Sequence, residues 1–80
     1  MPDIHTRLQR TFSAVFPELP PQGILAASTE TVDTWDSLAA ITLLAVLEQE
    51  FSVHIDPVDL PELNSFDAIH AHITRLVAVP

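Results

Sequence analysis

Apolar side chains recur every three or four residues in three stretches of the chain, residues 3–16, 37–51 and 66–77. This spacing places them on one face of a helix, so each stretch predicts an amphipathic helix that buries that face. The apolar positions are Ile4, Leu8, Phe12 and Phe16; then Leu38, Ile41, Leu44 (or Ala45), Leu47 (or Val46) and Phe51; and finally Phe66, Ile69, Ile73 and Leu76. The sequence has no pattern typical of a strand pair or a hairpin turn. It therefore predicts an all-α fold.

The first helix is expected to end at Pro17, where a long loop begins. Residues 17–23 contain three of the seven prolines and the only glycine of the chain, a composition typical of loops. The loop continues with little periodicity to the second helix. Because an unsupported loop of about 20 residues is unusual in a compact domain, we expect Ile24, Leu25 and Val32 to hold it against the core.

A short helix is predicted between the second and third long helices. Asp56 and Pro57 have the residue types of an N-cap and a first helical position, and Pro61 is expected to limit this helix to about one turn. Asn64 or Ser65 is then placed to cap the last helix. The predicted architecture is a four-helix bundle, with three main helices, one short helix and a long first loop.

The composition is that of a small globular domain with an acidic surface. Of the 80 residues, 48% are hydrophobic, and 11 Asp and Glu against three Arg leave a net charge of −8. So few cations could not neutralise a run of phosphates, which excludes nucleic acid and an anionic membrane surface as expected partners. We expect residues 1–80 to form a single domain and the protein to be a monomer.

The chain contains no cysteine, which excludes disulfides, thiolate nucleophiles and cysteine zinc sites. No apolar run approaches the roughly 20 residues of a membrane span, and the N-terminal residues lack the pattern of a secretory signal. A cytoplasmic location is therefore expected.

The most informative chemical feature is the tripeptide Asp36-Ser37-Leu38 at the start of the second predicted helix. Asp36 is suited to cap that helix, and the free N–H groups of a helix N-terminus favour a phosphate ester on the neighbouring serine. No histidine or lysine is spaced as a general base for Ser37, and no Gly-x-Ser-x-Gly turn is present. A serine without a base is a poor nucleophile but an adequate site of modification. Alternatively, Ser37 is only a helix cap.

The residues around this tripeptide resemble the acyl carrier protein family, in which Asp-Ser-Leu begins the second helix and is the phosphopantetheine attachment motif. The resemblance is ungapped over about residues 33–73. It includes the helix ending Glu48-Gln49-Glu50-Phe51, the isoleucine at Ile55 after a short turn, the short helix from Asp56 to Leu63, and the opening Ser65-Phe66-Asp67-Ala68-Ile69 of the last helix. Residues 1–32 agree with the family in length and pattern only.

The resemblance implies that Ser37 carries 4′-phosphopantetheine, attached from coenzyme A by a separate phosphopantetheinyl transferase, with Asp36 and Leu38 completing the motif. Such a phosphoprotein is not an enzyme. It holds acyl or polyketide-type intermediates as thioesters for fatty acid or polyketide biosynthesis. The implied partners are an acyl- or aminoacyl-loading ligase and downstream synthase enzymes. The alternatives are a peptidyl or aminoacyl carrier of a nonribosomal-type pathway, and a small helical protein-interaction module.

The chain departs from the pattern of many fatty-acid carriers in two ways. Trp35 replaces a glycine two positions before the serine, and Ala39, Ala40 and Thr42 stand where acidic residues are common. This loss of charge predicts a specialised-pathway carrier whose partners dock by hydrophobic contact more than by salt bridges. The candidate partner-binding residues are Asp33, Trp35, Ala40, Ile41 and Glu48. For Trp35, a buried position that closes the long loop is the competing interpretation.

The four histidines do not predict a metal site. His70 and His72 are two residues apart, which places them about 200° apart around a helix. His5 and His54 have no neighbouring ligand in the sequence. We therefore expect all four to lie at or near the surface, and no metal ion to be bound.

Overall fold

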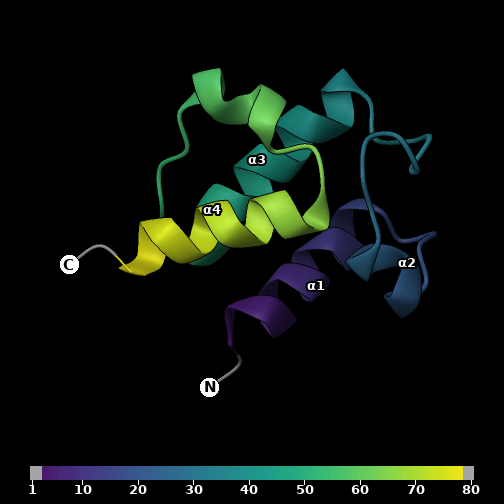
Figure 1. Cartoon of the computed structure of the whole chain (residues 1–80), viewed down its shortest axis with the longest axis horizontal. Helices are drawn as coiled ribbons and strands as arrows, with labels where there is room; N and C mark the ends of the chain where they lie inside the picture. The colour runs from purple at the N-terminus through teal and green to yellow at the C-terminus, as the bar shows by residue number, and fades with distance from the viewer. Residues whose placement is uncertain (1–2, 79–80) are drawn as a thin grey trace.

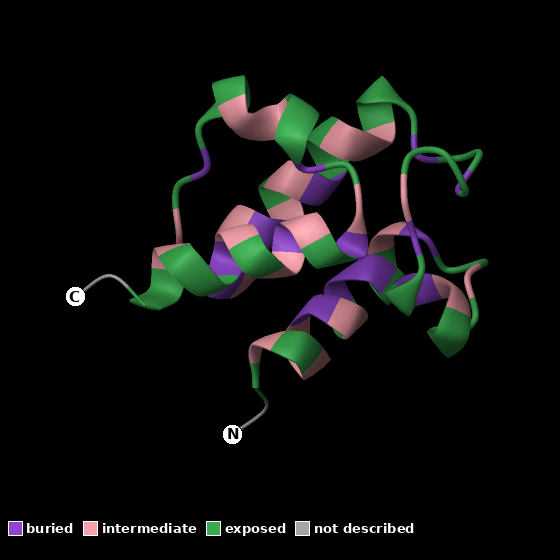
Figure 2. Ribbon diagram, in the orientation of Figure 1, coloured by how far each residue is buried: buried purple, intermediate pink, exposed green. Residues whose placement is uncertain are grey.

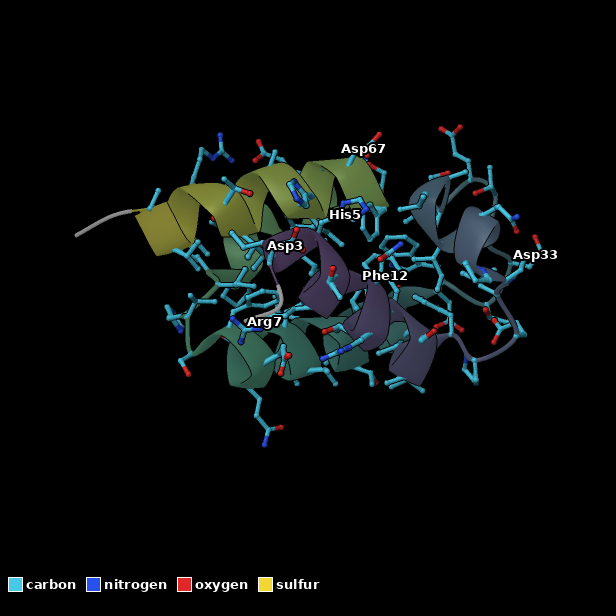
Figure 3. All side chains as sticks on the ribbon, turned by 90° about the horizontal axis from the view of Figure 1, so that it is seen from below. Asp3, His5, Arg7, Phe12, Asp33 and Asp67 are labelled. Atoms are coloured by element: carbon cyan, nitrogen blue, oxygen red, sulfur yellow. The ribbon has the colours of Figure 1, made fainter. Side chains whose placement is uncertain are left out.

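A computed structural model describes residues 3–78, so the ends of the expected 1–80 domain, residues 1–2 and 79–80, lie outside the described residues. Within that range the helical elements are α1 (Ile4–Val15), α2 (Pro21–Leu25), α3 (Ser37–Phe51), the 3₁₀ helix η1 (Pro57–Glu62) and α4 (Phe66–Ala78). The three long helices pack together, and η1 runs above them in the view of Figure 1. Seen from below, α1 lies between α3 and α4 (Figure 3). The all-α prediction is confirmed.

Side-chain caps account for most helix starts, and those at Asp36, Asp56 and Ser65 are the ones that the sequence predicts. Each capping oxygen accepts a hydrogen bond from a backbone N–H two or three residues later, which satisfies a donor that has no partner within the helix. The pairs are Asp3 with Thr6 (2.8 Å), Asp36 with Ala39 (2.9 Å), Asp56 with Val58 (3.0 Å) and Ser65 with Ala68 (3.0 Å). Of the two candidates for capping the last helix, Ser65 is therefore the cap.

The core is built from the inner faces of α1, α3 and α4 together with the long loop (Figure 2). Its centre is aromatic: Phe12 is fully buried and contacts Phe16, Trp35 and Phe66 at ring-centroid distances of 5.2–6.0 Å. The tilted and edge-on arrangements are those that aromatic rings favour. One ring of α1 thus joins the loop and α4 into a single core.

The predicted inward face of the second long helix is wrong at its N-terminal end. Leu38 and Ile41 are 73% and 56% exposed, while Leu43, Leu47 and Phe51 form the buried face of α3. The helix is apolar on nearly all sides, so its sequence contains two plausible apolar stripes. The rest of the molecule packs against the stripe whose residues are four apart, Leu43, Leu47 and Phe51. Leu38 and Ile41 are left facing outward.

The long loop is more structured than its composition predicts, because it contains the short helix α2. Pro21 is the first residue of this helix, a position where proline has no hydrogen bond to lose. Ile24 and Val32 are buried, as expected, but Leu25 is 41% exposed and does not hold the loop to the core. The prediction of one unbroken loop is corrected accordingly.

Backbone pairing fastens the loop to the start of α4. The Phe66 N–H donates to the Ala27 carbonyl, and the Thr29 N–H donates to the Asn64 carbonyl, both at 2.9 Å. These bonds flank an isolated antiparallel bridge between Ser28 and Ser65. The loop therefore crosses the N-terminal end of α4 before it reaches α3.

The short helix η1 continues through Pro61 to Glu62, so the expected limit of one turn at Pro61 is also wrong. In an α-helix, a proline ring clashes with the carbonyl four residues earlier. The 3₁₀ helix η1 instead pairs residues three apart, and it continues beyond Pro61.

Candidate functional site

Ser37 is the first residue of α3, and its side chain is exposed. The preceding residue, Asp36, caps the helix by accepting the Ala39 N–H at 2.9 Å. No hydrogen bond of the Ser37 hydroxyl is found among residues 3–78. The positive end of a 15-residue helix favours a phosphate ester at this position. The structure thus leaves Ser37 accessible, and the capping role of the alternative interpretation belongs to Asp36.

An open hollow of about 350 Å³ lies beside Ser37, between α3 and η1. Ser37, Ala40 and Ile41 form the α3 side, and the opposite side is formed by Pro57, Leu60 and Pro61. All of these side chains are uncharged, and five of the six are apolar. A long, flexible group attached to Ser37 has an apolar surface to lie on as soon as it leaves the helix, so the residues present fit the implied phosphopantetheine arm.

The η1 side of this hollow escapes sequence reasoning. Pro57, Leu60 and Pro61 are about 20 residues from Ser37 along the chain, and only the packing of η1 beside α3 brings them together. The apolar composition of this short segment is the one sequence feature that could have pointed to them.

Two of the candidate partner-binding residues lie close to Ser37. Ala40 is half-buried and Ile41 is exposed, and both line the hollow. Leu38, the last residue of the Asp36-Ser37-Leu38 motif, is also largely exposed. This end of α3 therefore presents apolar side chains around the serine.

Asp33 lies in the loop before α3, exposed at the edge of the molecule (Figure 3). Glu48 lies about 16 Å from Ser37 along the helix axis at the usual rise per residue. Its carboxylate accepts the Ile55 N–H at 2.9 Å and lies 3.3 Å from Nδ1 of His54. Glu48 thus holds the turn after α3 in place. This structural task was not part of its prediction as a partner-binding residue.

Trp35 is the candidate that the structure removes from the surface. Its side chain is only 5% exposed and packs against Phe12 and Phe16 at ring-centroid distances of 5.5 Å. A partner docking on the surface could not reach most of the ring. The competing interpretation, a buried residue that closes the long loop, describes its position.

The histidines do not gather into a metal-binding cluster: in residues 3–78, no group of three or more His, Cys, Asp or Glu could hold a metal ion. His5 and His70 approach each other from α1 and α4, with ring centroids 5.7 Å apart, and both rings contact Phe66. Sequence spacing alone did not predict this pairing across two helices.

No helix in the described part of the chain is both long enough and apolar enough to cross a membrane.

Comparison with protein families matches residues 35–73 to the family described as the phosphopantetheine attachment site. The match begins at Trp35, includes all of α3 and η1, and ends within α4. A search of curated proteins finds no match. Members of the matched family carry covalently attached 4′-phosphopantetheine. The family match over residues 35–73, the all-α fold and the exposed serine at the start of α3 agree: residues 35–73 form a phosphopantetheine attachment domain, consistent with a carrier protein of the acyl carrier protein family.

Proposed function

We propose that Ser37 is the residue that carries 4′-phosphopantetheine. The observation that supports it best is the pairing of Asp36 with the Ala39 N–H, which satisfies the helix end and leaves the adjacent hydroxyl exposed and without a structural task. Among residues 3–78 the Ser37 hydroxyl has no hydrogen-bond partner that could act as a general base, so activation of the hydroxyl falls to the transferase. In the transfer, a P–O bond forms at Ser37 Oγ, the pyrophosphate bond of coenzyme A breaks, adenosine 3′,5′-bisphosphate leaves, and the hydroxyl proton passes to the transferase.

We further propose that the carried group is an acyl or polyketide-type chain. When bound, the cofactor supplies the thiol that a cysteine-free chain lacks, and holds the cargo as a thioester. The side chains opposite Ser37 are Pro57, Leu60 and Pro61, which favour an apolar chain. A free ammonium group, as on an aminoacyl cargo, would lose hydration there without gaining a partner.

The partners that carrier proteins generally use are a phosphopantetheinyl transferase and synthase enzymes. Leu38 and Ile41 are exposed beside the proposed attachment site, and α3 has no charged residue from Ser37 to Leu47. These features support docking of such enzymes by apolar contact near the serine. Charged contacts are then left to Asp33 and Asp36, before and at the start of the helix.

Intact mass spectrometry tests the attachment site. Incubation with coenzyme A, magnesium and a broad-specificity phosphopantetheinyl transferase should add one phosphopantetheinyl group to the natural chain and none to Ser37→Ala. The substitution should change the free energy of unfolding by no more than about 0.5 kcal/mol, because the residue is exposed and is not the cap. Ser52→Ala, at the other end of α3, is the matched control and should be modified normally.

A mass gain in Ser37→Ala, or none in the folded natural chain with several transferases, would contradict the proposal. The same measurement on protein isolated from its native cells identifies the cargo. An acyl or polyketide mass is expected, and an aminoacyl mass would show the peptidyl-carrier alternative to be correct.

A further inference from the structure

A second, smaller cavity, partly open to the surface, adjoins the hollow at Ser37. Its walls come from α3, η1, α4 and the segments that precede α3 and α4, and include Leu47, Leu60 and Ile69. Ala40 and Leu60 line both spaces, so this cavity and the open hollow lie side by side. Every side chain on its wall is aliphatic except that of Trp35. The indole N–H is therefore the sole polar side-chain group among the residues that line it.

That N–H is also unusual within the described residues. Trp35 Nε1 is buried and has no hydrogen-bond partner, whereas the other buried side-chain nitrogen and oxygen atoms of residues 3–78 are paired. Buried polar groups are normally satisfied, because a donor removed from water without a new acceptor destabilises the fold. This exception calls for an acceptor that residues 3–78 do not supply.

A buried water is a poor candidate for that acceptor. The cavity measures about 10 Å³, the smallest space that holds one water. A buried water makes about three hydrogen bonds, and the other side chains that line the cavity are aliphatic and offer it no second polar partner. The acceptor must then come from a molecule that brings its own apolar surface for the remaining walls.

We propose that the acceptor is an oxygen atom carried along the cargo chain, a keto or hydroxyl oxygen, and that Trp35 selects oxygen-bearing acyl chains over fully saturated ones. The proposal rests on attachment of the cargo at Ser37 and names the class of chain that the proposed function leaves open. A saturated chain would contact the aliphatic walls equally well but would leave the indole N–H unpaired. An oxygen at the right depth satisfies it.

The cavity must widen to admit any chain, and η1 is the wall best able to move. None of its residues is buried, although Leu60 lines both the hollow and the cavity. Segments that bury little apolar surface open at low free-energy cost. Outward movement of η1 would join the two spaces into one channel that leads from Ser37 toward Trp35.

Nuclear magnetic resonance provides the test, because Trp35 is the only tryptophan and yields one indole resonance. The protein is loaded at Ser37 with pantetheine chains that carry an amide in place of the thioester. The chains are octanoyl, 3-oxooctanoyl and 5-oxooctanoyl. We expect at least one oxo chain to move the indole proton downfield relative to octanoyl, and to raise the melting temperature further than octanoyl does.

Trp35→Phe keeps an aromatic ring and removes the N–H, so the oxo and octanoyl forms of this variant should melt at the same temperature. The proposal is overturned if neither oxo chain shifts the indole resonance of the natural chain relative to octanoyl, a result that does not depend on the variant folding. It is also overturned if Trp35→Phe retains the difference in melting temperature. Failure of the chains to attach at Ser37 would instead contradict the proposed function.

Discussion

Two adjacent residues at the start of α3 have separate tasks. Asp36 stays in extended backbone and accepts a hydrogen bond from the Ala39 N–H, while Ser37 is already helical and keeps an exposed hydroxyl. If serine were the cap, its oxygen would be engaged with the backbone and less available to a transferase. An aspartate directly before the serine therefore caps the helix and leaves the serine hydroxyl free for modification.

A second capping aspartate leads to a prediction about acid stability. The pKa of Asp3 lies below its ordinary value, chiefly because its carboxylate accepts a hydrogen bond from the Thr6 backbone N–H. A lowered pKa in the folded state stabilises the fold above the ordinary value of about 3.9, and this contribution is lost as pH falls through the lowered pKa. Asparagine also caps helices but does not titrate. We expect Asp3→Asn to lose less stability than the natural chain between pH 5 and pH 3.

Urea unfolding at a series of pH values measures this difference. Asp33→Asn removes one carboxylate from an exposed loop position and serves as the control for net charge. Identical pH profiles for the natural chain and Asp3→Asn would show that the Asp3 cap makes no pH-dependent contribution.

At the scale of the element, α3 has two apolar faces with different uses. Leu43, Leu47 and Phe51 bury one face in the core, while Leu38 and Ile41 remain exposed beside Ser37. A helix that is apolar on most sides is ordinarily buried on most sides. Here the exposed part coincides with the proposed attachment site, where a carrier has to contact its partner enzymes.

The C-terminal end of α3 is held by a residue in an unfavourable conformation. Ser52 has φ 53° and ψ 45°, the left-handed region that glycine adopts without strain, and its N–H donates to the Glu48 carbonyl. Ser52→Gly should therefore raise the free energy of unfolding by about 0.5–1 kcal/mol, after allowance for the greater freedom of glycine in the unfolded chain.

Urea denaturation of Ser52→Gly checks this value, and Ser52→Ala is the control because it keeps the β-carbon and should show no gain. A Ser52→Gly variant no more stable than the natural chain would mean that the left-handed turn costs nothing here.

At the scale of the whole molecule, negative charge is the dominant electrostatic feature. The chain has a net charge of −8 and measures 36 × 30 × 18 Å over its described residues. Repulsion acts over about 30 Å in 0.01 M salt, the full width of the molecule, but over only about 8 Å in 0.15 M salt. The one arginine–carboxylate ion pair of the described residues, Arg7 with Glu50, is partly exposed and loses little on screening.

We therefore expect the melting temperature to rise as sodium chloride increases from 0.01 to 0.15 M at neutral pH. Differential scanning calorimetry measures the change, and potassium chloride should give the same result if screening is the cause. A melting temperature that stays constant or falls would show that repulsion among the carboxylates does not limit stability.

Local features of the sequence were sufficient for the all-α class, for the ends of the long helices and for the serine motif. Asp36 and Ser65 act on N–H groups within three residues of themselves, so sequence spacing alone determines whether those bonds can form. The Asp36-Ser37-Leu38 motif is equally local. The resemblance of residues 33–73 to a carrier family is therefore a property of the sequence itself.

Tertiary packing decided what local spacing could not. The apolar pattern of α3 allows more than one inward face, and the core selected the one that exposes Ile41. The hollow at Ser37 requires η1, a segment distant in sequence, to lie beside α3. Burial of Trp35 depends on Phe12 and Phe16 of a different part of the chain. Each of these features is a contact between elements that are distant in the sequence. The free energy of such a contact depends on both surfaces that meet, so the residues of one element alone do not determine it.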